Sequence, residues 1–165
     1  MGKCKIKIKD MYEKSLGAGL FAICPETGRF LLIKRRNDVK FPEYWSVPGG
    51  NFDEEDGYPK RTAVREFREE TGYKGPVKIS KEPIYIKTDN HINFYVYVGI
   101  LPFEFVPNLQ GEGSESEPES LAYSWVPVTC KWDENDKVVP SVITVMDTKA
   151  DLLAKVINKF KDKNF

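Results

Sequence analysis

Three glutamates lie close together near the middle of this 165-residue chain. Glu66, Glu69 and Glu70 belong to the stretch REFREETG (65–72). At roughly 100° per residue, a helix places their carboxylates on one face. Like charges at this spacing oppose helix formation by a few tenths of a kcal/mol per pair, so a compensating cation is expected. A hard divalent ion such as Mg²⁺ meets that need, since it prefers carboxylate oxygens and retains waters and phosphates as further ligands.

The same pattern also fits a solvated acidic face without a metal. Arg61, Arg65 and Arg68 alternate with the glutamates and could neutralise them through ion pairs. For an isolated acidic stripe we would favour this second interpretation. The sequence on either side of the stripe therefore decides between the two.

A helix must position the glutamates, and its limits are visible in the sequence. Pro59 is typical of a first helical turn and Gly72 of a C-terminal stop, with no other helix breaker between them. We therefore predict a helix of about three turns over 60–71. Ala63 and Phe67 fall on the adjoining face, so the acidic stripe runs along the edge of a packed surface.

Upstream of this helix, the segment YWSVPGG (44–50) ends in two glycines. Twin glycines permit a close backbone approach, which leaves a carbonyl free to face a ligand. The candidate metal ligands are therefore the Gly50 carbonyl (or that of Gly49) and the side chains of Glu66, Glu69 and Glu70.

From Gly50 to Tyr73 the sequence resembles the Nudix box, G-x5-E-x7-R-E-U-x-E-E-x-G-U, where U is a bulky apolar residue. Its second half, 65–73, matches at every fixed position, with Tyr as a loose match for the last one. The first half departs, because Gly57 stands where the family has Glu and the loop carries one extra residue. Asp56 or Glu55 could replace the missing Glu.

The resemblance implies an α/β (α+β) fold, a Nudix-type α/β/α sandwich with a mixed central β-sheet. It implies hydrolysis of the pyrophosphate linkage in a nucleoside diphosphate linked to another moiety, such as a nucleoside triphosphate, a nucleotide sugar or a dinucleotide, with Mg²⁺ or Mn²⁺ as cofactor. Glu66 and Glu69 would be catalytic. Arg65 would orient a motif carboxylate through a charge-assisted pair.

A further glutamate is expected from a loop. In many similar proteins a loop Glu before an aromatic–Trp strand completes the metal site or acts as the base. Here the acidic stretch QGEGSESEPES (110–120) precedes such a strand. Counting back from Trp125, Glu119 is the best match, with Glu117 next and Glu112 as a third alternative.

Candidate substrate-binding residues lie on two predicted strands. Arg35 and Arg36 end the strand RFLLIKR (29–35) and could bind phosphate as bidentate donors, or could equally be surface charges. Tyr95 in the strand INFYVYVGIL (92–101) could stack on a base, although aromatics at this spacing more often pack within a sheet. The single histidine, His91, has no partner in sequence and receives no catalytic role.

The remaining elements complete a single domain over 1–165. We expect an N-terminal extension with an edge strand (1–15), a hairpin of strands 17–24 and 29–35, strands near 82–87 and 121–128, and a C-terminal helix (147–163) capped by Asp147 or Thr148.

Composition excludes several classes of protein. Twenty-five basic residues balance 25 acidic ones, so there is no net field to attract nucleic acid or a membrane surface. No apolar run approaches the roughly 20 residues of a membrane span. Three widely spaced cysteines favour reduced thiols in a cytoplasmic protein over a disulfide framework. The expected partner is a small nucleotide, and a homodimer is possible because dimers are common among similar proteins.

Two other functions remain open. Gly57 at the usual Glu position would suit a degenerate Nudix domain that binds a nucleotide without cleaving it, although the intact REFREE half (65–70) argues against this. The run from Arg35 to Gly50 is similar to GDP-mannose-type nucleotide-sugar hydrolases, but those enzymes depart from the R-E-U-x-E-E pattern that this chain keeps.

Overall fold

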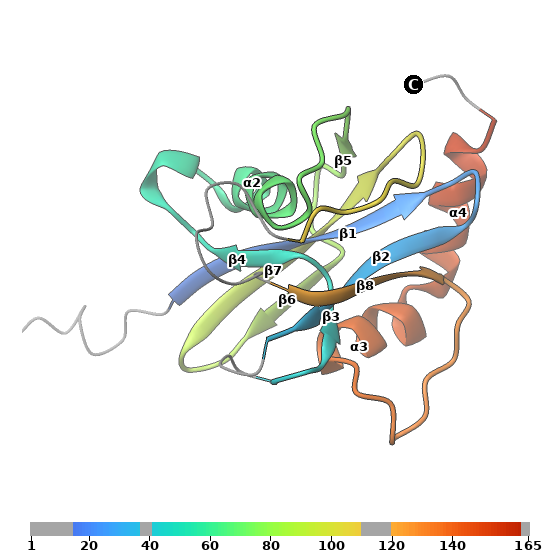
Figure 1. Cartoon of the computed structure of the whole chain (residues 1–165). Helices are drawn as coiled ribbons and strands as arrows, with labels where there is room; N and C mark the ends of the chain where they lie inside the picture. The colour runs from blue at the N-terminus through green and yellow to red at the C-terminus, as the bar shows by residue number, and fades with distance from the viewer. Residues whose placement is uncertain (1–14, 37–40, 110–119, 163–165) are drawn as a thin grey trace, which may run out of the picture.

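The structure is a computed structural model that describes residues 15–36, 41–109 and 120–162 (Figure 1). Its strands are β1 (Ser15–Cys24), β2 (Arg29–Arg35), β3 (Trp45–Ser46), β4 (Gly49–Asn51), β5 (Lys78–Ile79), β6 (Tyr85–Thr88), β7 (Ile92–Ile100) and β8 (Ser120–Pro127). Its helical elements are a short 3-10 turn, η1 (Glu54–Asp56), and the helices α2 (Pro59–Thr71), α3 (Pro140–Thr148) and α4 (Ala150–Phe160).

All eight strands join one mixed sheet around β1. β1 runs parallel to β7 and antiparallel to β2 and β4. β8 pairs antiparallel with β2 along most of its length. From Gly17 onward every residue of β1 is buried, as expected for an apolar strand covered on both faces.

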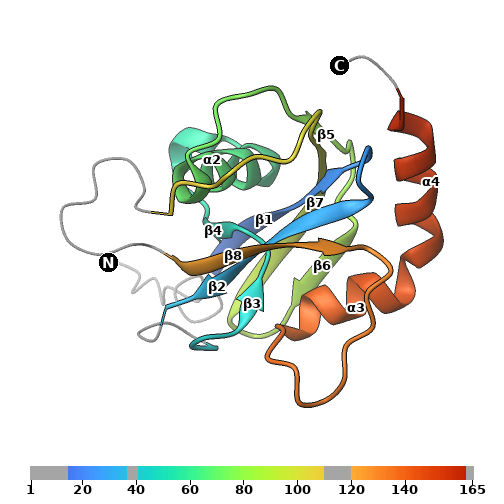
Figure 2. The same cartoon turned by 45° about the vertical axis from the view of Figure 1, so that its right-hand side comes forward.

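Helices cover both faces of this sheet (Figures 1 and 2). α2 packs over β1, β4 and β7, where Ala63 and Phe67 join a cluster with Leu20, Leu31 and Tyr97. α3 and α4 lie on the opposite side. The predicted α/β/α sandwich with a mixed central sheet is confirmed.

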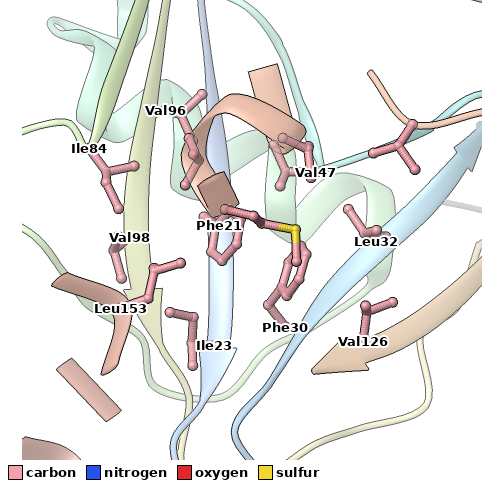
Figure 3. Packing of buried hydrophobic residues seen from close by; sticks show 14 of the residues in the cluster. Phe21, Ile23, Phe30, Leu32, Val47, Ile84, Val96, Val98, Val126 and Leu153 are labelled. Carbon is pink, nitrogen blue, oxygen red and sulfur yellow. The ribbon is translucent and has the colours of Figure 1, made fainter. Parts of the chain in front are cut away.

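The larger core lies between the sheet and the C-terminal helices. Phe21 of β1 stacks on Phe30 of β2, with ring centroids 4.1 Å apart. Figure 3 shows these two rings in the middle of the cluster, with Ile23, Leu32 and Leu153 around them. α3 and α4 are therefore held by the same apolar face that binds the central strands together.

The first hairpin forms as predicted. The backbone N–H groups of Thr27 and Gly28 both donate to the Cys24 carbonyl, and Gly28 takes the positive φ of 70° that this turn requires. The strand predicted over 82–87 begins instead at Tyr85, because Pro83 has no N–H to donate to the ladder.

The C-terminal helix predicted over 147–163 is present as α4 (Ala150–Phe160), but its predicted cap is wrong and α3 was not predicted. The chain forms two helices here, and Asp147 and Thr148 end α3 and do not cap α4. Thr148 donates its hydroxyl to the Thr144 carbonyl, and α4 begins after Lys149 without a side-chain cap. The β-branched residues of α3 have low helix propensity, which burial against the sheet overrides.

The apolar residues of α4 recur on the face that packs against the larger core. Leu153 is buried, and Val156, Ile157 and Phe160 pack against the larger core. Leu152 is 46% exposed and lies at the margin of this contact. The predicted edge strand within residues 1–15 lies outside the described residues, apart from Ser15, which opens β1.

Replacing Phe21 by Ala should lower the free energy of unfolding by about 3–5 kcal/mol, because it removes a fully buried ring and leaves a cavity beside Phe30. Urea denaturation would measure this. The exposed Phe103 supplies the control, and Phe103→Ala should change stability by less than about 0.5 kcal/mol. Equal effects of the two substitutions would contradict the assigned core.

Candidate active site

Helix α2 carries the acidic stripe, and both of its ends follow from sequence. Pro59 occupies its first turn. Gly72 closes it in the left-handed conformation, with φ 72° and its N–H donated to the Arg68 carbonyl. The predicted helix over 60–71 is thus confirmed, one residue longer at its start.

Arg65 is the centre of an ion-pair network at the start of the acidic stripe. Its Nε lies 2.7 Å from Asp56 Oδ1, and its Nη2 lies 3.0 Å from Asp56 Oδ2. Its Nη1 donates to Glu66 Oε1 at 3.0 Å and to Glu69 Oε2 at 3.1 Å. Its Nη2 also donates to the Asn51 carbonyl at 2.9 Å. One guanidinium therefore joins β4, η1 and two of the three glutamates.

Asp56 is the carboxylate that fixes this arginine. Only 6% of the residue is exposed, and it also accepts the hydroxyl of Thr62 at 2.8 Å and the N–H of Asp53 at 3.0 Å. The Arg65 guanidinium holds the pKa of Asp56 well below its usual range. The pKa of Arg65 is raised in turn, chiefly by its hydrogen bonds to Asp56.

Of the two residues considered as replacements for the motif Glu, the structure brings Asp56 to Arg65. Glu55 is exposed on η1, where its backbone N–H donates to Asp53 Oδ1. Gly57, at the usual Glu position, has φ 81°, a conformation that ends η1 and that a glutamate would adopt only with strain. With one extra residue in the loop, the carboxylate that supports Arg65 is that of Asp56, one position before Gly57, where the family has its Glu.

The three glutamates of α2 have different surroundings. The side chain of Glu66 is 16% exposed, that of Glu69 is 51% exposed, and Glu70 as a residue is 9% exposed. A Cβ added to Gly50 would lie 2.4 Å from the carboxyl carbon of Glu66. Glycine at position 50 is therefore required for the close approach between β4 and the Glu66 carboxylate.

The Gly50 carbonyl, predicted as a metal ligand, lies beside β1. A Cβ added to Gly17 would come within 2.8 Å of this oxygen. Gly50 pairs with Ala18 in the β1–β4 ladder. The twin glycines thus serve the packing of β4 against both β1 and α2.

Glu70 faces a small cavity together with the arginines at the end of β2. This cavity has a volume of about 140 Å³. Its lining comprises Ile33, Arg35, Arg36, Ser46, Val47, Gly49, Glu70 and Ser120. Burial lowers the pKa of Arg35, and the nearby Glu70 carboxylate opposes that shift. Two predicted phosphate-binding arginines and one predicted metal-binding glutamate therefore meet at one place.

Sequence reasoning missed the two serines of this cavity. Ser46 and Ser120 are both buried. Ser120 lies opposite Arg35 at an irregularity in the β2–β8 ladder, after Lys34. No local signal indicates this position, because it depends on the register between two strands that are far apart in sequence.

Other predicted residues lie elsewhere. Tyr95 is partly buried against the α2-side cluster and is not among the residues that line the cavity. His91 lies in the turn before β7, where its N–H donates to Asp89 Oδ1. Glu112, Glu117 and Glu119 lie outside the described residues.

The donors on α2 suit a hard divalent cation, because they are all carboxylate oxygens. Within residues 15–36, 41–109 and 120–162, however, no three Asp, Glu, His or Cys side chains converge into a ready ligand set. Arg65 holds Glu66 and Glu69 instead. The ligand chemistry therefore fits a metal, while the charge on two of the carboxylates is offset by the guanidinium.

Comparison with known proteins identifies the family. The family model of the NUDIX domain matches residues 13–140. The chain belongs to the Nudix family. Protein 111R of Invertebrate iridescent virus 3, whose name groups it with hydrolases, is 31% identical over 132 residues. That match covers 76% of this chain and 66% of the viral protein.

Solved structures agree on the fold. A NUDIX hydrolase from Alicyclobacillus acidocaldarius superimposes with a TM-score of 0.69 at 14% identity, over 93% of this chain and 100% of that one. The NUDIX domain of Shewanella oneidensis NrtR, solved with ADP-ribose, gives a TM-score of 0.65 at 15% identity, over 93% and 99% of the two chains. The chain is thus a Nudix hydrolase by family, and the solved structures show that it has the Nudix fold. Among its described helices, none is long and apolar enough to cross a membrane.

Asp56→Asn should lower the free energy of unfolding by about 2 kcal/mol at neutral pH, since it leaves a partly buried guanidinium without its main partner. The pKa of Asp56 is depressed in the folded state, so its contribution is complete above its unfolded pKa of about 4. That contribution is lost as the pH falls through the lower folded value. Urea denaturation from pH 7 to pH 2 would follow it.

Glu55→Gln is the matched control, because Glu55 is a neighbouring but exposed carboxylate. Its stability should follow that of the native chain at every pH. A difference between the Asp56→Asn variant and the native chain that stays constant from pH 7 to pH 2 would contradict the assigned ion pair.

Proposed function

We propose that this Nudix hydrolase cleaves the pyrophosphate linkage of a nucleoside diphosphate joined to another moiety, with Mg²⁺ or Mn²⁺ as cofactor. The observation that carries the proposal is the cavity where Glu70 of the motif helix faces Arg35 and Arg36. Anionic phosphate oxygens need cationic partners, and arginine supplies bidentate donors for them. Nudix hydrolases generally use divalent metal ions.

Glu66, Glu69 and Glu70, with a backbone carbonyl from Gly49 or Gly50, would hold the metal. When bound, such an ion neutralises phosphate oxygens and lowers the pKa of a coordinated water. Arg35 and Arg36 would bind the phosphates and orient them toward α2. Water attacks one phosphorus atom, the anhydride P–O bond breaks, and a motif carboxylate or Glu119 takes the proton from water.

Arg65 acts on this chemistry through the carboxylates that it holds. Its bonds to Glu66 and Glu69 restrict their rotamers, and Asp56 restricts Arg65 in turn. Arg65 is therefore a positioning residue, as the motif resemblance implies, with Asp56 in the supporting role of the family's missing glutamate.

The substrate class is open to a direct test. The NrtR domain, similar in fold, was solved with ADP-ribose, so ADP-ribose heads the list of substrates. Product release should be measured with Mg²⁺ and with Mn²⁺ on ADP-ribose, nucleoside triphosphates, NADH, dinucleoside polyphosphates, GDP-mannose and capped RNA. Product identity separates cleavage at phosphorus from cleavage at the sugar carbon, which would instead support the GDP-mannose-type reaction.

Glu66→Gln should lower kcat on the best substrate by about 10²–10⁴-fold, because it removes a negative oxygen from the site and keeps the side-chain shape. Glu134→Gln, at an exposed carboxylate far along the chain, should leave kcat unchanged. Turnover that survives Glu66→Gln would contradict the assignment of the catalytic helix.

Arg35→Lys should raise KM about 10–100-fold with a smaller effect on kcat, because lysine cannot form the bidentate contact to phosphate. Arg29→Lys is the matched control, since Arg29 lies on the same strand but pairs with Glu104, away from the cavity. An unchanged KM in the Arg35 variant would show that this arginine is a surface charge.

A nucleotide-binding domain without hydrolysis is the second candidate. It is favoured by the lack of a converged ligand set among the described carboxylates. Binding of ADP-ribose by calorimetry, with no turnover of any substrate in either metal, would establish it.

Location and assembly are separate parts of the proposal. Cys24 and Cys130 are free thiols, which supports a reducing, cytoplasmic location. A homodimer is also proposed, and light scattering would decide between one and two chains.

A further inference from the structure

Another cavity lies between α4 and the 78–84 segment, and it shares no lining residue with the cavity at Glu70. Its volume is about 560 Å³. In Figure 2, α4 lies at the right of the sheet and α2 lies at its upper left. The apolar residues that line it are Ile79, Pro83, Ile84, Val98, Ile100, Leu152, Val156 and Phe160. We call this cavity the lysine-rimmed groove, for the charges described next.

Four lysines line the same groove, Lys78, Lys81, Lys149 and Lys159, against a single acidic residue, Glu82. The chain as a whole has a net charge of zero, so this excess is local. The Nζ atoms of Lys78 and Lys159 lie 5.5 Å and 5.3 Å from the centroid of the Phe160 ring. The aromatic ring thus gathers two ammonium groups at one end of an apolar surface.

Size and charge together select the kind of ligand. The volume falls within the range of about 300–1,000 Å³ that is typical of small-molecule sites. A peptide helix with its side chains is about 10–12 Å wide. A single turn of such a helix would fill roughly the whole groove, so the groove is too small for a helical peptide partner. A small molecule with an extended apolar body and an anionic end matches both the apolar lining and the lysines.

We propose that the lysine-rimmed groove binds an anionic amphiphile, a medium- or long-chain carboxylate. Its alkyl chain lies on the apolar residues of β7 and α4, and its carboxylate lies among the lysines. The site is separate from the cavity at Glu70, so this binding does not depend on the proposed hydrolysis and is measured without turnover.

Calorimetric titration with octanoate, decanoate and dodecanoate, each below its micelle concentration, tests the proposal on the full chain. We expect one saturable site per chain and affinity that rises about fourfold per added methylene until the groove is filled. 1-Decanol, which lacks the charge, should bind at least about tenfold more weakly than decanoate. Absence of saturable binding, or equal affinity for the alcohol, would overturn the proposal.

Variants locate the site. Lys149→Gln combined with Lys159→Gln should weaken decanoate binding about tenfold, by removing two cations from the groove. Leu152→Asp should weaken it at least as much, at a position exposed enough to tolerate the change. Lys155→Gln is the control, because Lys155 is exposed on the same helix but does not line the groove.

Circular dichroism melts of all four proteins would show that the variants remain folded. Decanoate affinity that is unchanged by Leu152→Asp, or reduced equally by Lys155→Gln, would contradict binding in this groove.

Discussion

The candidate site depends on one guanidinium. Three glutamates on one helical face repel one another, and Arg65 offsets this repulsion by bonding to two of them. Arg65 is itself held by the buried Asp56 and by the Asn51 carbonyl. The interaction joins the end of β4, the η1 turn and α2 into one unit. The acidic face can therefore fold before any substrate or cation binds.

The sheet supplies the second constraint, because it brings distant segments to this unit. β1 is buried on both faces, and it pairs with β4 at Gly17–Gly19 and with β2 at Ile23 and Cys24. Arg35 at the end of β2 consequently reaches the cavity at Glu70. Glycine at position 50 lets β4 approach the Glu66 carboxylate without a side chain between them. Apolar packing thus sets the distances at which the charged groups act.

Local patterns predicted most of this architecture, and nonlocal pairing accounts for what they missed. Pro59, Gly72 and the intervening periodicity predicted α2, and the run from Arg65 to Gly72 predicted the family. Helix α3 was missed because its β-branched residues have low helix propensity, which only burial against the sheet overrides. Ser46 and Ser120 were missed because strand register, which sequence spacing does not reveal, places Ser46 opposite Ile33 and Ser120 opposite Arg35, where both line the cavity. Asp56 was one of two alternatives until the geometry of η1 placed it on Arg65.

The proposed function requires that α2 present a carboxylate site for a divalent cation. Titration of the protein with Mn²⁺, followed by the electron paramagnetic resonance of the free ion, tests it without any choice of substrate. We expect saturable binding to the native chain, and binding at least about tenfold weaker when Glu66 and Glu70 are both replaced by Gln. Native protein that leaves all the Mn²⁺ free, or a double variant that binds as tightly as the native chain, would contradict it.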